Sequence, residues 1–171
     1  MIAYGLGDAG TGLAATQLGF YLFPFFTGTA GLPAVIAGSL LMVIKVWDAF
    51  NDPLIGWMSD HTKTRWGPRL PWMIGASAPL GISLAAMWWV PPGDITQKTT
   101  YYVVMAILLM TAYTGVNLPF AALSTELTED TYIRTRLNAA RFTGSILAGL
   151  SGLIIAARLL SEGDSGYVSM G

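Results

Sequence analysis

Two aspartates, Asp48 and Asp52, lie in a stretch that is otherwise apolar enough to sit inside a membrane. Because they are four positions apart, a helix would place their carboxylates on one face, one turn apart. A carboxylate at the centre of a bilayer costs roughly 2.5–3.5 kcal/mol on insertion scales. Such carboxylates usually face a water-filled cavity or a partner charge, and they mark an ion or substrate path. The pair therefore predicts either a cation site or a structural ion pair with Lys45 or an arginine of another helix.

The composition is that of a membrane protein. Of the 171 residues, 53% are hydrophobic and only 11% are charged, whereas a soluble domain carries about 25% charged residues. There is no cysteine and one histidine, His61, which excludes disulfides and thiolate metal sites and argues against a histidine-based metal site or triad. The Lys and Arg residues are few and form no basic patch, so we expect no nucleic-acid partner.

Five apolar segments, each close to the ~20 residues that span a bilayer, predict an all-α membrane protein. Basic residues are concentrated in the loop after the second segment, with Lys63, Arg65 and Arg69, and in the loop after the fourth, with Arg134 and Arg136. Since basic loops stay on the cytoplasmic side, we expect a cytoplasmic N-terminus, and no cleavable signal peptide is evident. The expected helices cover residues 2–26, 34–58, 70–90, 99–123 and 137–160.

A motif follows the second segment. Gly56 and Asp60 form G-x-x-x-D, and Arg65, Gly67 and Arg69 come after it. An aspartate at a helix end can pair with an arginine or accept hydrogen bonds from backbone N–H groups. The motif resembles the cytoplasmic loop between helices 2 and 3 of the major facilitator superfamily, where it acts as a latch between two halves of a carrier. The alternative is an ordinary basic inner loop with a capping aspartate.

Four motifs in chain order narrow this resemblance. They are Y-G-L-G-D at 4–8, W-D-A-F-N-D-P at 47–53, R-W-G at 65–67 and N-L-P-F at 117–120. Together they resemble the glycoside–pentoside–hexuronide:cation symporters, the family of melibiose permease. The resemblance implies a twelve-helix major facilitator fold, of which this chain would supply the first five transmembrane helices. It would then be an N-terminal fragment, inactive alone, whose partner is the missing C-terminal helices.

The resemblance implies a cation site. In the family, the aspartates that match Asp48 and Asp52 coordinate the coupling ion, and the position of Thr114 supplies a hydroxyl. Two carboxylates offer hard oxygen ligands to Na⁺, and either of them can take a proton instead. We expect no cofactor besides the coupling ion, with Na⁺ and H⁺ both left open.

The resemblance also implies a substrate site at Asp8, Asn117 and Arg141. Asn117 occupies the position of a sugar-binding acid of melibiose permease, so a galactoside is in doubt, and its alternative is a kinked packing helix. Arg141 matches an arginine that helps to define the sugar site; alternatively it reaches the interface or pairs with an inner-face acid. Asp8 lies one turn before the family's helix 1 sugar-binding position. It either lines the cavity or ends a helix near the inner surface.

The expected function is cation-coupled symport of a sugar or glycoside across a bacterial inner (plasma) membrane, with membrane lipid and a small sugar as partners. The first alternative is a relative of the same fold that carries a lysolipid or another solute. The second is an intramembrane aspartyl protease, because residues 5–8 read G-x-G-D. That motif is short and weak, and in the protease family the Y-D helix comes before it, whereas Asp48 and Asp52 follow. We therefore expect a transporter and no enzyme.

Overall fold

The computed structural model describes residues 7–128 and 130–160, and this described part is entirely helical apart from short connections. The all-α expectation is thereby confirmed. The helices are α2 (Ala9–Thr27), α3 (Ala34–His61), α4 (Leu70–Met87), α5 (Ile95–Leu127) and α6 (Thr131–Leu160).

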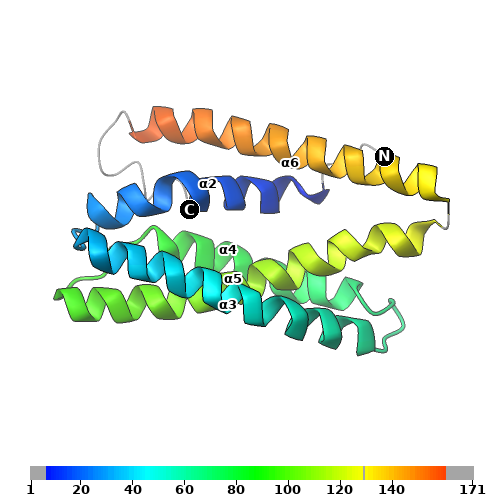
Figure 1. Ribbon diagram of the computed structural model, residues 1–171, viewed down its shortest axis with the longest axis horizontal. Helices are drawn as coiled ribbons and strands as arrows, with labels where there is room; N and C mark the ends of the chain where they lie inside the picture. Colours follow the sequence, from blue (N-terminus) through cyan, green and yellow to red (C-terminus); the bar gives the residue numbers. More distant parts are fainter. Residues whose placement is uncertain (1–6, 129, 161–171) are drawn as a thin grey trace.

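The helices form two layers that run up and down along one long axis (Figure 1). One layer is the pair α2 and α6, which lie against each other, and the other is made of α3, α4 and α5. Helix α5 has extensive contacts with α3 and α4 and also touches α2 and α6. Helix α5 therefore contacts each of the other four helices, and α3 also touches α2 across the two layers.

Two helices begin earlier than the sequence predicts, because an aspartate caps each of them. Helix α5 begins at Ile95 rather than at 99, since the Asp94 side chain accepts a hydrogen bond from the Gln97 N–H at 2.9 Å. Helix α6 begins at Thr131 rather than at 137, and Asp130 Oδ1 accepts from the backbone N–H of Tyr132 at 2.8 Å. Side-chain acceptors of this kind satisfy the free N–H groups of a first helical turn.

The other described boundaries differ by four residues or fewer, and the largest of these differences is the end of α5 at Leu127 rather than at 123. Helix α3 ends at His61 rather than at 58, which places Asp60 in its last turn. Helix α4 ends at Met87 rather than at 90, because the residue before Pro91 is disfavoured in a helical conformation. The expected start of the first helix at Ile2 lies outside the described residues.

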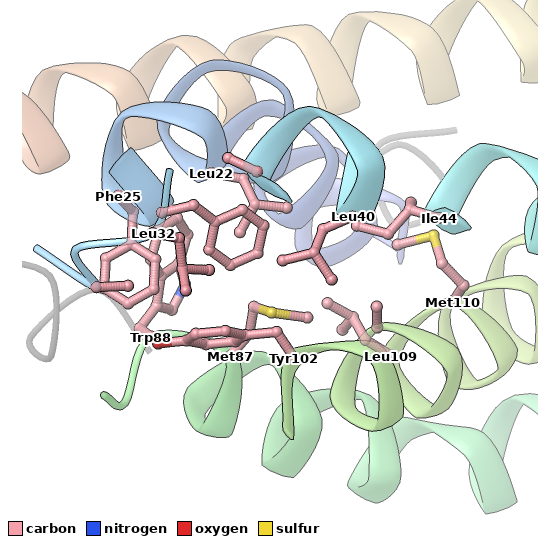
Figure 2. Close-up of a cluster of buried hydrophobic side chains, with 14 of the residues drawn as sticks. Leu22, Phe25, Leu32, Leu40, Ile44, Met87, Trp88, Tyr102, Leu109 and Met110 are labelled. Carbon is pink, nitrogen blue, oxygen red and sulfur yellow. The ribbon is translucent and has the colours of Figure 1, made fainter. Parts of the chain in front are cut away.

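Aromatic side chains join the two layers at the end of the bundle where α2 finishes (Figure 2). Phe25 of α2 meets Trp88 edge to face at 5.2 Å between ring centroids, and Phe26 meets Tyr102 of α5 at 4.8 Å. All four side chains are fully buried. Aromatic pairs contribute roughly 0.5–1.5 kcal/mol each beyond their burial, so this cluster fixes α2 against the layer that contains α5.

Glycine lets α2 and α6 approach closely. A Cβ added to Gly12 would lie 2.7 Å from the Ser145 carbonyl oxygen and 2.8 Å from its Cα, and one added to Gly152 would lie 3.1 Å from Leu13 Cγ. Small residues at helix interfaces are the common means of such close packing in membranes. Gly12 and Gly152 therefore set the distance between these two helices.

Within the described residues, α3 to α6 are long and apolar enough to cross a membrane. Helix α2, in which Thr11, Thr16 and Gln17 interrupt the apolar residues, does not reach the same level. Large apolar side chains such as Ile82 and Ile154 stand exposed on the outside, where lipid would cover them. The chain is an integral membrane protein.

The close approach of α2 and α6 can be tested with matched alanine substitutions. Gly12→Ala should destabilise the protein by about 1–3 kcal/mol, because the new methyl group meets the Ser145 backbone, which cannot easily move. Gly10→Ala is the control, since a Cβ there meets nothing within 4 Å. Thermal unfolding in detergent should show a lower Tm for Gly12→Ala alone; equal shifts for both variants would contradict the packing.

Candidate functional site

The structure brings two of the three expected cation ligands into direct contact. Asp48 and Asp52 lie one turn apart on α3, and Thr114 faces them from α5. The Thr114 hydroxyl donates a hydrogen bond to Asp52 Oδ1 at 2.9 Å. Thr114 is buried, Asp48 is half-buried and Asp52 is exposed on the surface of the described bundle. This group of residues thus offers two carboxylates from α3 and one hydroxyl from α5.

Neither carboxylate belongs to an ion pair within the part of the chain that the structure describes. The salt bridges found there join Asp60 to Arg69 and Asp8 to Arg141. Lys45, the partner considered from the sequence, lines the same cavity as Asp48 without forming a salt bridge with it. Among these residues, the structural ion-pair alternative is not realised.

Asp48 opens onto a cavity of about 340 Å³ between α2, α3 and α5. At ~30 Å³ per molecule, such a space has room for on the order of ten waters. Lys45 and Tyr113 supply the other polar side chains. The remaining lining is Ala15, Leu18, Gly19, Leu22, Leu41, Ile44 and Met110. Water access of this kind lowers the free-energy cost of keeping a carboxylate within the membrane.

The donor set decides which ion would fit. Asp48, Asp52 and Thr114 offer only oxygen atoms, which suit hard cations, and either carboxylate can hold a proton. The described residues contain no group of three or more His, Cys, Asp or Glu side chains placed to hold a metal ion. The arrangement fits a weakly bound monovalent cation or a proton better than a transition metal.

A second polar cluster gathers the three residues expected at the substrate site. Asp8 Oδ2 accepts a hydrogen bond from Arg141 Nε of α6 at 2.9 Å. Its Oδ1 accepts from the Thr11 hydroxyl at 2.5 Å and from Asn117 Nδ2 of α5 at 3.5 Å. The Asp8 side chain is 4% exposed and that of Arg141 is 11% exposed. Of the alternatives considered for Arg141, the structure shows pairing with an acid, and this acid is Asp8 at the start of α2.

Sequence reasoning did not single out Asn51, Thr11 or Tyr113. Asn51, which lies between the two aspartates in the sequence, is buried and donates to the Met110 carbonyl at 3.3 Å, so it joins α3 to α5. The Tyr113 hydroxyl lies 3.5 Å from Asn117 Nδ2 and lines the cavity of Asp48. Of these three, only the contact of Thr11 with Asp8 could have been predicted from the sequence, because residues three positions apart share a helix face.

The G-x-x-x-D motif at the end of α3 and the arginines after it are partly assembled. Asp60 Oδ1 lies 3.5 Å from Arg69 Nη2. Because the Asp60 side chain is 61% exposed, this ion pair adds little stability. Gly67 adopts a φ of +87° that favours glycine. Arg65 does not join Asp60; it lies over the Trp66 ring at 5.2 Å. Gly56 faces α5, where a Cβ would come within 3.2 Å of Leu118.

One family description and several relatives match this chain along most of its length. The family described as MFS/sugar transport protein matches residues 3–170. An uncharacterized symporter of Synechocystis sp. is 43% identical, covering 99% of this chain and 33% of the relative. The isoprimeverose transporter of Lactiplantibacillus pentosus is 31% identical, covering 84% of this chain and 30% of the relative. The sodium-dependent lysophosphatidylcholine symporter 1 of Xenopus tropicalis is 28% identical, covering 94% and 31%.

These coverages also give the scale of the chain. It spans about a third of the length of the curated relatives that it matches. The Asp48–Thr114 group and the Asp8–Arg141 cluster both lie within the matched residues.

The cavity beside Asp48 can be tested by thiol labelling, since this chain has no cysteine of its own. In a background without other cysteines, Asp48→Cys should react with a small methanethiosulfonate at least about tenfold faster than Asn51→Cys, because thiol exchange depends on access. Asn51 is the control because it is on the same helix and 3% exposed. Equal rates at the two positions would show that the cavity does not admit water.

Proposed function

The chain belongs to the MFS/sugar transport protein family, and from this premise we propose that it forms part of a carrier that moves a sugar or glycoside together with Na⁺ or H⁺. The observation that carries the proposal is the Asp52–Thr114 contact, with Asp48 one turn away and without a salt bridge in the described residues. Carboxylates left unpaired inside a membrane protein are expensive and are retained where they serve an ion path.

Helix α5 provides a physical route for coupling. Thr114 contacts Asp52 of the cation group, and Asn117, three residues later, contacts Asp8 of the substrate cluster. A cation at Asp48 and Asp52 neutralises the carboxylates and favours the position of α5 in which Thr114 is engaged. Since Asn117 moves with the same helix, this favours one arrangement of the substrate site. Linkage then requires that substrate raise cation affinity by the same factor.

The second cluster suits a substrate rich in hydroxyl groups. Arg141 and Asn117 carry N–H donors that can bind sugar oxygens. The guanidinium also lies 5.9 Å from the Phe120 ring centroid, so an apolar face borders the polar groups. The isoprimeverose transporter among the relatives supports a sugar substrate. We assign Arg141 and Asn117 to substrate binding and Asp8 to the same cluster.

A lysolipid is the second candidate, and the lysophosphatidylcholine symporter among the relatives is the observation in its favour. A site for acyl chains should be mainly apolar, whereas Asp8, Arg141 and Asn117 form a polar, charged cluster. This difference favours the sugar.

The protein is no enzyme, since its family and its relatives are transporters. In addition, Asp8 of the G-x-G-D motif pairs with an arginine rather than with a second aspartate.

The rest of the carrier follows from the length of the relatives. We propose that further helices complete the substrate site and that residues 1–171 alone do not transport. The membrane would be a bacterial inner membrane with the N-terminus cytoplasmic. In this topology the loop of Asp60 and Arg69 would act as the latch toward the other half.

Uptake into membrane vesicles tests the proposal. The complete protein would be given neutral glycosides, pentosides, glucuronides and one lysolipid, with and without an inward Na⁺ or H⁺ gradient. Asp52→Asn should lose gradient-driven sugar uptake by at least about tenfold, as expected when one interaction of a charged group is removed. Asp94→Asn is the charge-matched control, because asparagine caps a helix as well as aspartate does. Lysolipid uptake without sugar uptake would favour the second candidate, and unchanged ion dependence in Asp52→Asn would contradict the cation site.

Thr114 should set cation affinity. Thr114→Val keeps the side-chain volume but removes the oxygen that contacts Asp52, so the half-saturating cation concentration should rise about tenfold. Thr100→Val is the control on the same helix, since its hydroxyl bonds the Thr96 carbonyl one turn back. The measurement is sugar uptake as a function of cation concentration. Equal curves for the two variants would remove Thr114 from the site.

A further inference from the structure

We propose that Asp8 is a positioning residue, which orients Arg141 toward the substrate and makes no substrate contact of its own. The inference rests on the proposed function and refines it. From the family resemblance, Asp8 is expected to bind substrate. The structure assigns it a different task.

Both carboxylate oxygens of Asp8 are already occupied. Oδ2 accepts from Arg141 Nε, while Oδ1 accepts from the Thr11 hydroxyl and from Asn117. Thr11 also holds the backbone, because its hydroxyl lies 3.0 Å from the Asp8 carbonyl oxygen. With 4% of its side chain exposed, Asp8 presents no open face to a sugar hydroxyl.

Arg141, by contrast, keeps donors in reserve. Its contact with Asp8 runs through Nε, which leaves the two terminal amino groups of the guanidinium for another ligand. The Phe120 and Phe142 rings lie 5.9 and 5.4 Å from its central carbon. A long arginine side chain is otherwise conformationally free. The Nε contact and the two rings together fix the plane of the fork, which is the geometry needed to bind a pair of adjacent hydroxyls.

The position of Asp8 at the start of α2 also suits a carboxylate. Asp8 is the residue that precedes the first turn of α2, and it makes no capping hydrogen bond with its side chain. The helix N-terminus carries partial positive charge and favours a carboxylate. Asp8 and Arg141 form a salt bridge, so each compensates the charge of the other. An arginine left without this partner would be an uncompensated buried charge.

A double-mutant cycle on the complete protein tests the inference, with binding of a sugar that wild type transports as the readout. Asp8→Asn should weaken sugar affinity about tenfold, as expected for losing a charge-assisted contact. In the Arg141→Gln background, the same change should weaken it by less than about twofold, because residues that act through one another are not additive. A tenfold loss in both backgrounds would show that Asp8 binds the sugar directly and would overturn the inference.

Singly deoxygenated sugars give a second readout. Asp8→Asn should reduce discrimination at the same hydroxyl positions as Arg141→Lys and at no others. A hydroxyl that is sensitive to Asp8→Asn but not to Arg141→Lys would overturn the inference. Asp8→Glu keeps the charge and displaces the guanidinium, so it should give the same profile and replaces Asp8→Asn if that variant does not reach the membrane.

Two controls separate the inference from the function on which it rests. Thr11→Val removes a hydrogen bond to Asp8 and should weaken sugar affinity, whereas Thr27→Val on the same helix should not, because its hydroxyl bonds the Phe23 carbonyl. The half-saturating cation concentration in the absence of sugar should stay unchanged in Asp8→Asn. Absence of gradient-driven sugar uptake in wild type would refute the proposed function itself, whereas uptake with an additive cycle would refute only the role of Asp8.

Discussion

A charged side chain inside a membrane must be paired or must reach water, and this constraint accounts for how the polar residues of this chain are arranged. Asp8 and Arg141 meet the constraint by pairing across α2 and α6. Asp48 meets it differently, by opening onto a cavity of about 340 Å³. The charges of Asp8 and Arg141 therefore compensate each other, whereas Asp48 and Asp52 form no ion pair within the described residues.

Helix α5 connects these two solutions. It contacts both layers of the bundle, and its polar residues lie within one turn of each other, with Tyr113 and Thr114 toward the carboxylates and Asn117 toward Asp8. Pro119 lies inside the same helix, where it removes a backbone hydrogen bond. Near its start, this helix is packed against α2 through the contact between Tyr102 and Phe26. Its polar middle is where the two sites come together.

The sequence predicted the parts that depend on composition and local spacing. The five helices follow from apolar segments, and the facing of Asp48 and Asp52 follows from a spacing of four. The pairing of Asp8 with Arg141 could not be predicted, because it joins residues 133 positions apart. It also depends on the close approach of α6 to α2, which the glycines of α2 permit. The helix starts at Ile95 and Thr131 were missed for a local reason, since Asp94 and Asp130 extend each helix beyond its apolar part.

The central claim is that one helix couples a cation site to a sugar site, and thermodynamic linkage tests it most directly. Sugar affinity of the complete protein would be measured with and without saturating cation, and cation affinity with and without saturating sugar, in wild type and in Asp52→Asn. The account predicts that each ligand raises the affinity for the other by one common factor, and that this factor falls to one in Asp52→Asn. A factor of one in wild type, or an unchanged factor in Asp52→Asn, would contradict it.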